Sequence, residues 1–145
     1  MRPFFPIASI VFLVGILSGC AATSNLSATQ AGATIDVKTS TKASSPRTES
    51  FNATSFGNYE FRAQAAGHEP FFGILPLKFN GGYLALDILL FAPAALFNLR
   101  EVEPFYKFDI EKKVVKFRTK ESDEWSTYVP LEAEAARARD FFKNL

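Results

Sequence analysis

FYKFDIEKKVVKFRTKESDEWSTYV, residues 105–129, is the stretch of sequence that decides the fold. Apolar side chains alternate with polar ones in FYKFDI, VVKFRTK and WSTYV, and a period of two is typical of half-buried strands. The polar runs EKK and ESDE, which separate these pieces, predict turns. The stretch therefore predicts a three-stranded antiparallel meander that is apolar on one face and packed on that face only.

The chain ends with PLEAEAARARDFFKNL, residues 130–145, which predicts an amphipathic helix. One helical stripe is formed by Leu131, Ala135, Ala138, Phe142 and Leu145. Glu132 and Glu134 lie near the start of this segment, and the helix dipole favours acidic residues there. The basic residues Arg137, Arg139 and Lys143 come later, as the dipole also favours. We expect this helix to cover the apolar face of the meander.

An apolar run, GYLALDILLFAPAALFNL, occupies residues 82–99 and carries a single charge, Asp87. It is nearly as long as the roughly 20 residues that span a bilayer, but Asp87 and Pro93 disfavour a simple span. One interpretation is a core helix around 87–99 that Asp87 caps at its N-terminus. The other is a segment that enters or binds lipid, in which Asp87 becomes a candidate functional acid.

The piece NYEFRAQAA, residues 58–66, alternates like a half-buried strand. Residues 56–145 are therefore predicted to form one small α+β domain. Its fold class is a small antiparallel sheet, the C-terminal meander, packed by the C-terminal amphipathic helix and by the apolar helical segment around 87–99.

Residues 20–55 are rich in Ser, Thr, Ala and Asn and poor in large apolar side chains. Such a segment buries too little apolar surface to offset its ordering entropy, so we predict a disordered polar tether. A short strand over 33–38 is the alternative, because Ile35 and Val37 alternate with Asp36 and Lys38.

The N-terminus carries the marks of a secretory signal. Arg2 is followed by an almost wholly apolar run from Phe4 to Leu17, which is shorter than the roughly 20 residues of a membrane span. A basic start, an apolar centre and small residues after it predict that residues 1–19 are a signal peptide.

Leu17-Ser18-Gly19-Cys20 resembles the lipobox of bacterial lipoproteins. The resemblance implies cleavage between Gly19 and Cys20, and a lipid on Cys20 that consists of a thioether-linked diacylglycerol and an amide-linked acyl chain such as palmitate. Two or more chains anchor a protein stably. Ala21 then follows the lipidated cysteine, which in enteric bacteria implies the outer membrane, facing the periplasm.

The apolar segment also carries a resemblance. LDILLFAP, residues 86–93, is similar to the Asp-Thr…Pro turn of small enterobacterial lipoproteins, with Ile88 in place of the threonine. This similarity implies the class of small envelope lipoproteins, and no residue role is carried over.

Charge and residue types restrict the chemistry. Loss of Arg2 with the signal leaves 15 of the 16 basic residues against 15 acidic ones, so we expect no nucleic-acid partner. His68 is the only histidine and Cys20 the only cysteine, so we expect no metal site. The chain also lacks a nucleophile elbow, a phosphate loop and a dinucleotide fingerprint. We therefore predict no cofactor and no enzymatic activity.

Three functions remain open from the sequence. The leading one is a lipid-anchored, non-catalytic cell-envelope protein that acts by contact with other envelope components, including a protein partner. The second adds insertion of residues 82–99 into lipid. The third is a small hydrolase of envelope sugars or lipids, because 15 carboxylates are present and the sequence cannot pair them.

Overall fold

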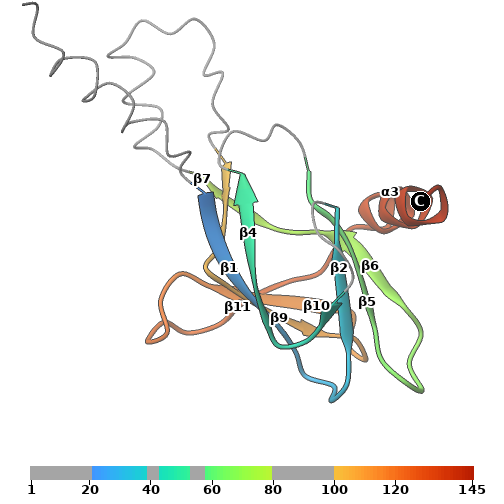
Figure 1. Cartoon of the computed structure of the whole chain (residues 1–145), viewed down its shortest axis with the longest axis horizontal. Coiled ribbons are helices and arrows are strands. Elements are labelled where there is room, and N and C mark those ends of the chain that lie inside the picture. The colour runs from blue at the N-terminus through green and yellow to red at the C-terminus, as the bar shows by residue number, and fades with distance from the viewer. Residues whose placement is uncertain (1–20, 39–42, 53–57, 80–99) are drawn as a thin grey trace, which may run out of the picture.

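A computed structural model describes residues 21–38, 43–52, 58–79 and 100–145 (Figure 1). The strands are β1 (Ala21–Ala28), β2 (Thr34–Val37), β3 (Ala43–Ser44), β4 (Arg47–Asn52), β5 (Glu60–Gln64), β6 (Phe71–Ile74), β7 (Leu77–Phe79), β8 (Arg100–Val102), β9 (Phe105–Asp109), β10 (Val114–Arg118) and β11 (Ser126–Tyr128). The helix is α3 (Glu132–Lys143). The described part of the chain is thus mostly β, and the predicted α+β class is wrong. The helical segment expected around 87–99 lies outside the described residues.

The strands form three sheets. The largest has the order β11-β10-β9-β1-β4, the second has the order β3-β2-β5-β6, and β7 pairs with β8. The predicted meander is confirmed, since β9, β10 and β11 pair antiparallel in sequence order. It is not a separate sheet, however, because β1 joins it in parallel to β9, with Asn25 opposite Phe105 and Ala28 opposite Phe108.

The tether predicted over residues 20–55 is wrong for the residues described there, which form β1 to β4. The alternative of a strand within 33–38 is confirmed by β2. β1 lies in the interior of its sheet between β4 and β9, and Ser24 and Leu26 are fully buried. β1 is therefore stabilised by backbone hydrogen bonds to β4 and β9. Apolar side chains of other strands bury it, since it carries few large apolar side chains itself.

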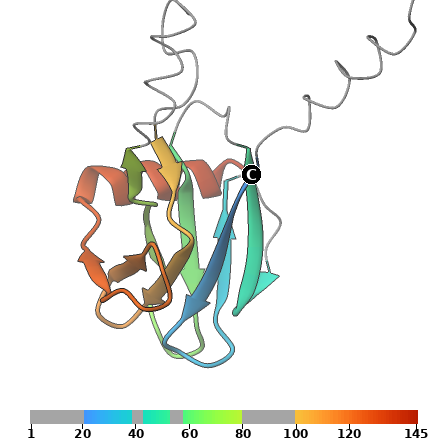
Figure 2. The same cartoon turned by 90° about the vertical axis from the view of Figure 1, so that its left-hand side faces the viewer.

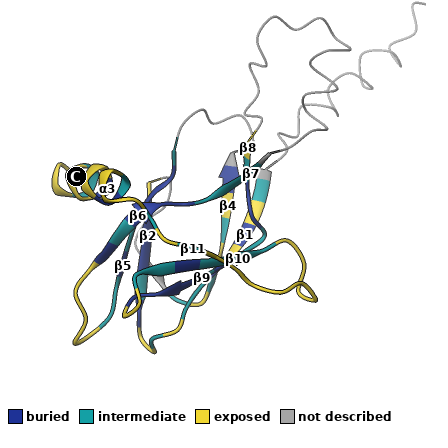
Figure 3. Cartoon of the chain, turned by 180° about the vertical axis from the view of Figure 1, so that it is seen from behind, coloured by how far each residue is buried: buried dark blue, intermediate teal, exposed yellow. Residues whose placement is uncertain are grey.

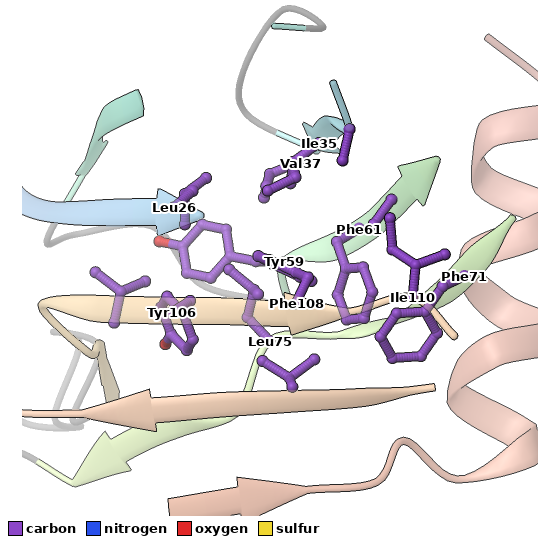
Figure 4. Close-up of a cluster of buried hydrophobic side chains, with 14 of the residues drawn as sticks. Leu26, Ile35, Val37, Tyr59, Phe61, Phe71, Leu75, Tyr106, Phe108 and Ile110 are labelled. Atoms are coloured by element: carbon purple, nitrogen blue, oxygen red, sulfur yellow. The ribbon is translucent and has the colours of Figure 1, made fainter. Parts of the chain in front are cut away.

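The two larger sheets face each other across one hydrophobic core (Figure 4). The Phe61 ring of β5 meets the Phe108 ring of β9 edge to face, with centroids 4.9 Å apart, and the Phe71 ring of β6 at 5.0 Å. Such aromatic pairs add about 0.5–1.5 kcal/mol each beyond the area that they bury. The apolar face of the meander is therefore covered by a second sheet.

The C-terminal helix is confirmed, but its expected place on the meander is wrong. α3 packs against β5 and β6, on the outer face of the four-stranded sheet (Figures 1 and 3). Ala135 and Ala138 are buried there. On the core face of β6, Gly73 leaves room for the Phe61 and Pro130 rings, since a Cβ at this position would lie 2.8 Å from the first and 2.7 Å from the second. The meander had no free apolar face left for the helix.

Candidate functional site

The first residue of β1 and the β7–β8 pair lie at one end of the domain (Figure 2). β1 begins at Ala21, directly after Cys20, and Ala21 pairs with Asn52 at the end of β4. β8 precedes β9, and β9 runs parallel to β1, so β8 lies beside the first residues of β1. Phe79 of β7 pairs with Arg100 of β8. We call this the β1 end, defined by the backbone at residues 21, 52, 79 and 100.

The predicted lipidation and cleavage residues precede the described part of the chain. Leu17, Ser18, Gly19 and Cys20 therefore have no place in the structure, and Asp87 also lies outside the described residues. What the structure does place is the residue after Cys20. It is the first residue of an interior strand.

The opposite end of the domain consists of turns. Gly32 lies between β1 and β2 and Gly67 between β5 and β6, and both adopt the positive φ that favours glycine. His68 lies exposed in the second of these turns, where its backbone amide donates to the Ala65 carbonyl at 3.2 Å. Lys113, the last residue of the turn between β9 and β10, also has a positive φ of 54°.

A cluster of charged side chains lies between α3 and the four-stranded sheet. Glu60 is 1% exposed, and its Oε1 accepts from Arg137 Nε at 2.7 Å while its Oε2 lies 3.1 Å from Lys38 Nζ. Asp36, 4% exposed, accepts from Arg62 Nε at 2.9 Å and Nη2 at 2.7 Å. Each buried carboxylate is thus matched by cationic groups, as buried charges require.

Aromatic rings complete this cluster. Lys38 Nζ lies 5.3 Å from the centroid of the Phe141 ring, and the Arg62 guanidinium lies 5.0 Å from that of Phe142. Both distances fall within the roughly 6 Å of a cation–π contact. The cluster therefore fixes the helix on the sheet, and its carboxylates are engaged in ion pairs that hold the fold.

A shallow groove of about 190 Å³ separates β6 from the start of α3. Its lining includes Pro70, Phe71, Phe72, Lys113, Pro130 and Arg139. Lys113 Nζ closes one side by donating to the carbonyls of Glu69 at 2.6 Å and Pro70 at 3.2 Å. Pockets for small molecules usually measure about 300–1,000 Å³, so this groove is smaller than a typical ligand site.

Two tyrosines have pKa values raised by their surroundings. Burial raises the pKa of Tyr106, whose hydroxyl donates to the Pro76 carbonyl at 2.6 Å and accepts from the Glu103 amide at 2.8 Å. Burial and a hydrogen bond to the Glu134 carboxylate raise the pKa of Tyr128 to about 12. Both hydroxyls stay protonated near neutral pH and serve as structural hydrogen-bond donors.

The pKa of Asp109 is shifted in the opposite direction. Burial acts to raise its pKa, but hydrogen bonds from the Lys112 amide at 3.1 Å and from Gln30 Nε2 at 3.3 Å lower it below 3.8 on balance. Asp109 is therefore a charged acceptor that ties the end of β9 to the turn after β1. None of these three groups has a pKa suited to acid–base catalysis near neutral pH.

Among the residues that the structure describes, no group of three or more His, Cys, Asp or Glu side chains is arranged to hold a metal ion. The helix in the described ranges is too short and too polar to cross a membrane.

No protein-family model matches this chain, and searches of curated proteins and of solved structures find no match either.

Sequence reasoning missed the ionic cluster under α3. Its residues were visible as alternating charges, with Asp36 and Lys38 on one strand and Glu60 and Arg62 on another. Such alternation indicates a solvent-facing strand face. The burial of Asp36 and Glu60 follows only from the packing of α3 on this face, for which the sequence carried no separate signal.

Proposed function

We propose that this protein is a lipid-anchored, non-catalytic component of the bacterial cell envelope. A lipid on Cys20 holds it at the membrane, in the outer membrane facing the periplasm, and it acts by contact with other envelope components. The observation that carries the proposal is the lipobox Leu17-Ser18-Gly19-Cys20 placed directly before a folded strand.

The charged groups of the described residues are consistent with this proposal. The acids buried under α3 are engaged by Lys38, Arg62 and Arg137 and stabilise the fold. His68 lies exposed in a turn, and the groove beside α3 is smaller than a typical ligand pocket. These features favour a role through surface contact over a role in turnover.

Metabolic labelling tests the anchor. The full-length chain is produced in a bacterium supplied with radiolabelled palmitate, beside the Cys20→Ala and Ser18→Ala variants. We expect label on the wild type and on Ser18→Ala, which keeps a small residue at that position, and none on Cys20→Ala. An exported, unlabelled wild-type chain, or label that persists in Cys20→Ala, contradicts the proposal.

A second candidate adds direct binding of residues 82–99 to lipid. The pairing of Phe79 with Arg100 favours it, because this apolar stretch leaves and re-enters the described fold at the β1 end. The Cys20→Ala chain, exported behind a cleavable secretory signal, provides the test. Retention of the folded domain in carbonate-washed membranes supports this candidate, and release into the soluble periplasmic fraction contradicts it.

A further inference from the structure

We propose that the β1 end of the domain faces the membrane surface, so that the turns at the opposite end point away from the lipid. This inference rests on the proposed function, because it requires the lipid on Cys20. The inference goes beyond the proposed function because it specifies which surface of the domain faces the lipid headgroups.

The first step is the length of chain between anchor and fold. Consecutive Cα atoms lie about 3.8 Å apart, and β1 begins at Ala21, the residue after Cys20. The lipid-bearing residue is therefore about 4 Å from the sheet. A flexible tether over residues 20–55 would instead have an r.m.s. length of roughly 30 Å and would leave the orientation free.

The second step is that β1 is held along both edges. It pairs with β4 from Ala21 to Leu26 and with β9 from Asn25 to Ala28. The pairing with β4 begins at the first residue of the strand, so no unpaired piece of β1 can act as a hinge. The direction of β1 therefore sets the orientation of the whole sheet relative to the anchor.

The third step is the size of the domain along this direction. β1 has 8 residues, and at about 3.3 Å per residue it spans roughly 26 Å. The turn that contains Ala31 lies beyond the far end of β1. Residues of this turn and of the turn at Glu111 are thus separated from the membrane surface by about the length of the strand.

The chemistry of the β1 end fits the headgroup layer. Arg100 is exposed there, and Lys78 Nζ lies 3.8 Å from Glu101 Oε2 across the β7–β8 pair. Charged groups are costly in hydrocarbon but are compatible with polar headgroups. The described fold therefore rests at the depth of the headgroups, and the acyl chains on Cys20 pass below it.

The chain itself supplies the labelling strategy for a test. Its only cysteine is consumed by the lipid, so an introduced cysteine provides a single free thiol. We choose Ser50→Cys on β4, which lies opposite Thr23 near the β1 end, and Ala31→Cys and Glu111→Cys in the far turns. All three side chains are exposed, and each variant is labelled with the same fluorophore.

The full-length lipidated variants are incorporated into vesicles of phosphatidylethanolamine and phosphatidylglycerol that carry a headgroup-attached quencher. We expect quenching at position 50 to be several-fold stronger than at positions 31 and 111. Equal quenching at all three positions, or stronger quenching in the far turns, overturns the proposed orientation. Thr23→Cys repeats the proximal measurement if Ser50→Cys unfolds at a lower denaturant concentration than the wild type.

Flotation of the vesicles separates the two proposals. Variants that float with the vesicles, carry palmitate and give equal quenching contradict only the orientation. A wild-type chain that carries no palmitate and does not float contradicts the anchor, and with it the orientation.

Discussion

Residues 105–128 and residues 21–28 form strands of the same five-stranded sheet, yet only the first stretch shows a strand pattern in its sequence. β9 and β10 alternate large apolar side chains with polar ones, whereas β1 reads AATSNLSA. β1 is nevertheless an interior strand, as β9 and β10 are, and it lies between β4 and β9. The comparison teaches that a strand with small side chains can lie in the interior of a sheet, because the larger side chains of neighbouring strands bury it.

The largest expected change in stability tests whether β1 belongs to the hydrophobic core as fully as β9 does. Leu26 and Phe108 are both fully buried. We expect Leu26→Ala to lower the free energy of unfolding by about 2–5 kcal/mol and Phe108→Ala by about 3–5 kcal/mol, as core truncations do. Urea denaturation followed by circular dichroism measures both.

Thr23→Ala is the matched control, because Thr23 lies on the exposed side of the same strand. We expect a change within about 0.5 kcal/mol. If Leu26→Ala costs no more than this control, β1 is not part of the folded core and the comparison fails.

The next largest change in stability is expected on the face of the four-stranded sheet that α3 covers. Arg137→Ala leaves the buried Glu60 carboxylate with Lys38 as its remaining charged partner in the described ranges. Since Arg137 itself is half exposed, we expect a loss of about 1–2 kcal/mol in the free energy of unfolding. Denaturation curves for Arg137→Ala and Arg139→Ala measure the difference.

Arg139 pairs with the exposed Glu132 on the outside of the same helix. Its removal should change stability by less than about 0.5 kcal/mol. Equal losses for the two variants would show that the cluster under α3 does not hold the helix on the sheet.

A smaller effect tests the link between the meander and the helix. Tyr128→Phe removes the hydrogen bond to Glu134, and we expect a loss of about 1 kcal/mol near neutral pH. The pKa of Tyr128 rises from 10.0 to about 12 on folding, so its contribution is complete below pH 10 and is lost as the pH rises toward 12. Stability measured between pH 8 and about 11 should fall less steeply in Tyr128→Phe. Parallel curves for the two proteins would contradict this assignment.

The smallest effect tests a direct contact between the two regions. Gln30, in the turn after β1, donates to Asp109 and accepts from the Ile110 amide at 3.0 Å. Gln30→Ala should cost about 1 kcal/mol and raise the pKa of Asp109 toward its ordinary value. Because the folded-state pKa of Asp109 is lowered, its stabilising contribution is present above pH 3.8 and is lost as the pH falls further.

Titration of the Asp109 side chain by nuclear magnetic resonance reads this change directly, with Glu111→Gln as the control in the neighbouring turn. An unchanged pKa in Gln30→Ala would mean that the Lys112 amide and the charges of Lys112 and Lys116 keep the pKa of Asp109 low without Gln30.

The sequence predicted the elements whose side chains repeat at a regular period. FYKFDI and VVKFRTK gave β9 and β10, and the stripe that contains Ala135 and Ala138 gave α3. It did not predict which surfaces meet, because the parallel pairing of β1 with β9 joins residues 80 positions apart. A hydrophobic pattern shows which of a segment's own side chains are apolar. β1 has few large apolar side chains, and it is buried because neighbouring strands pack around it.

Of the candidate site, the lipobox and the chemistry that it implies could be drawn from the sequence alone. The distance from the predicted lipidation site to the fold could not, because Ser, Thr and Ala in residues 21–28 suit a linker and an interior strand equally well. Likewise, Asp36 and Glu60 looked like solvent-facing charges until α3 was placed over them.

The interior position of β1 also has a mechanical consequence. A force applied at Ala21 enters the domain through a strand that is paired with β4 from Ala21 to Leu26 and with β9 from Asn25 to Ala28. Pulled along its own axis, such a strand loads many backbone hydrogen bonds at once in shear, and they must break together. Tension along β1 is therefore shared by two neighbouring strands. Under the proposed lipid on Cys20, a pull from the membrane would enter the fold through these bonds.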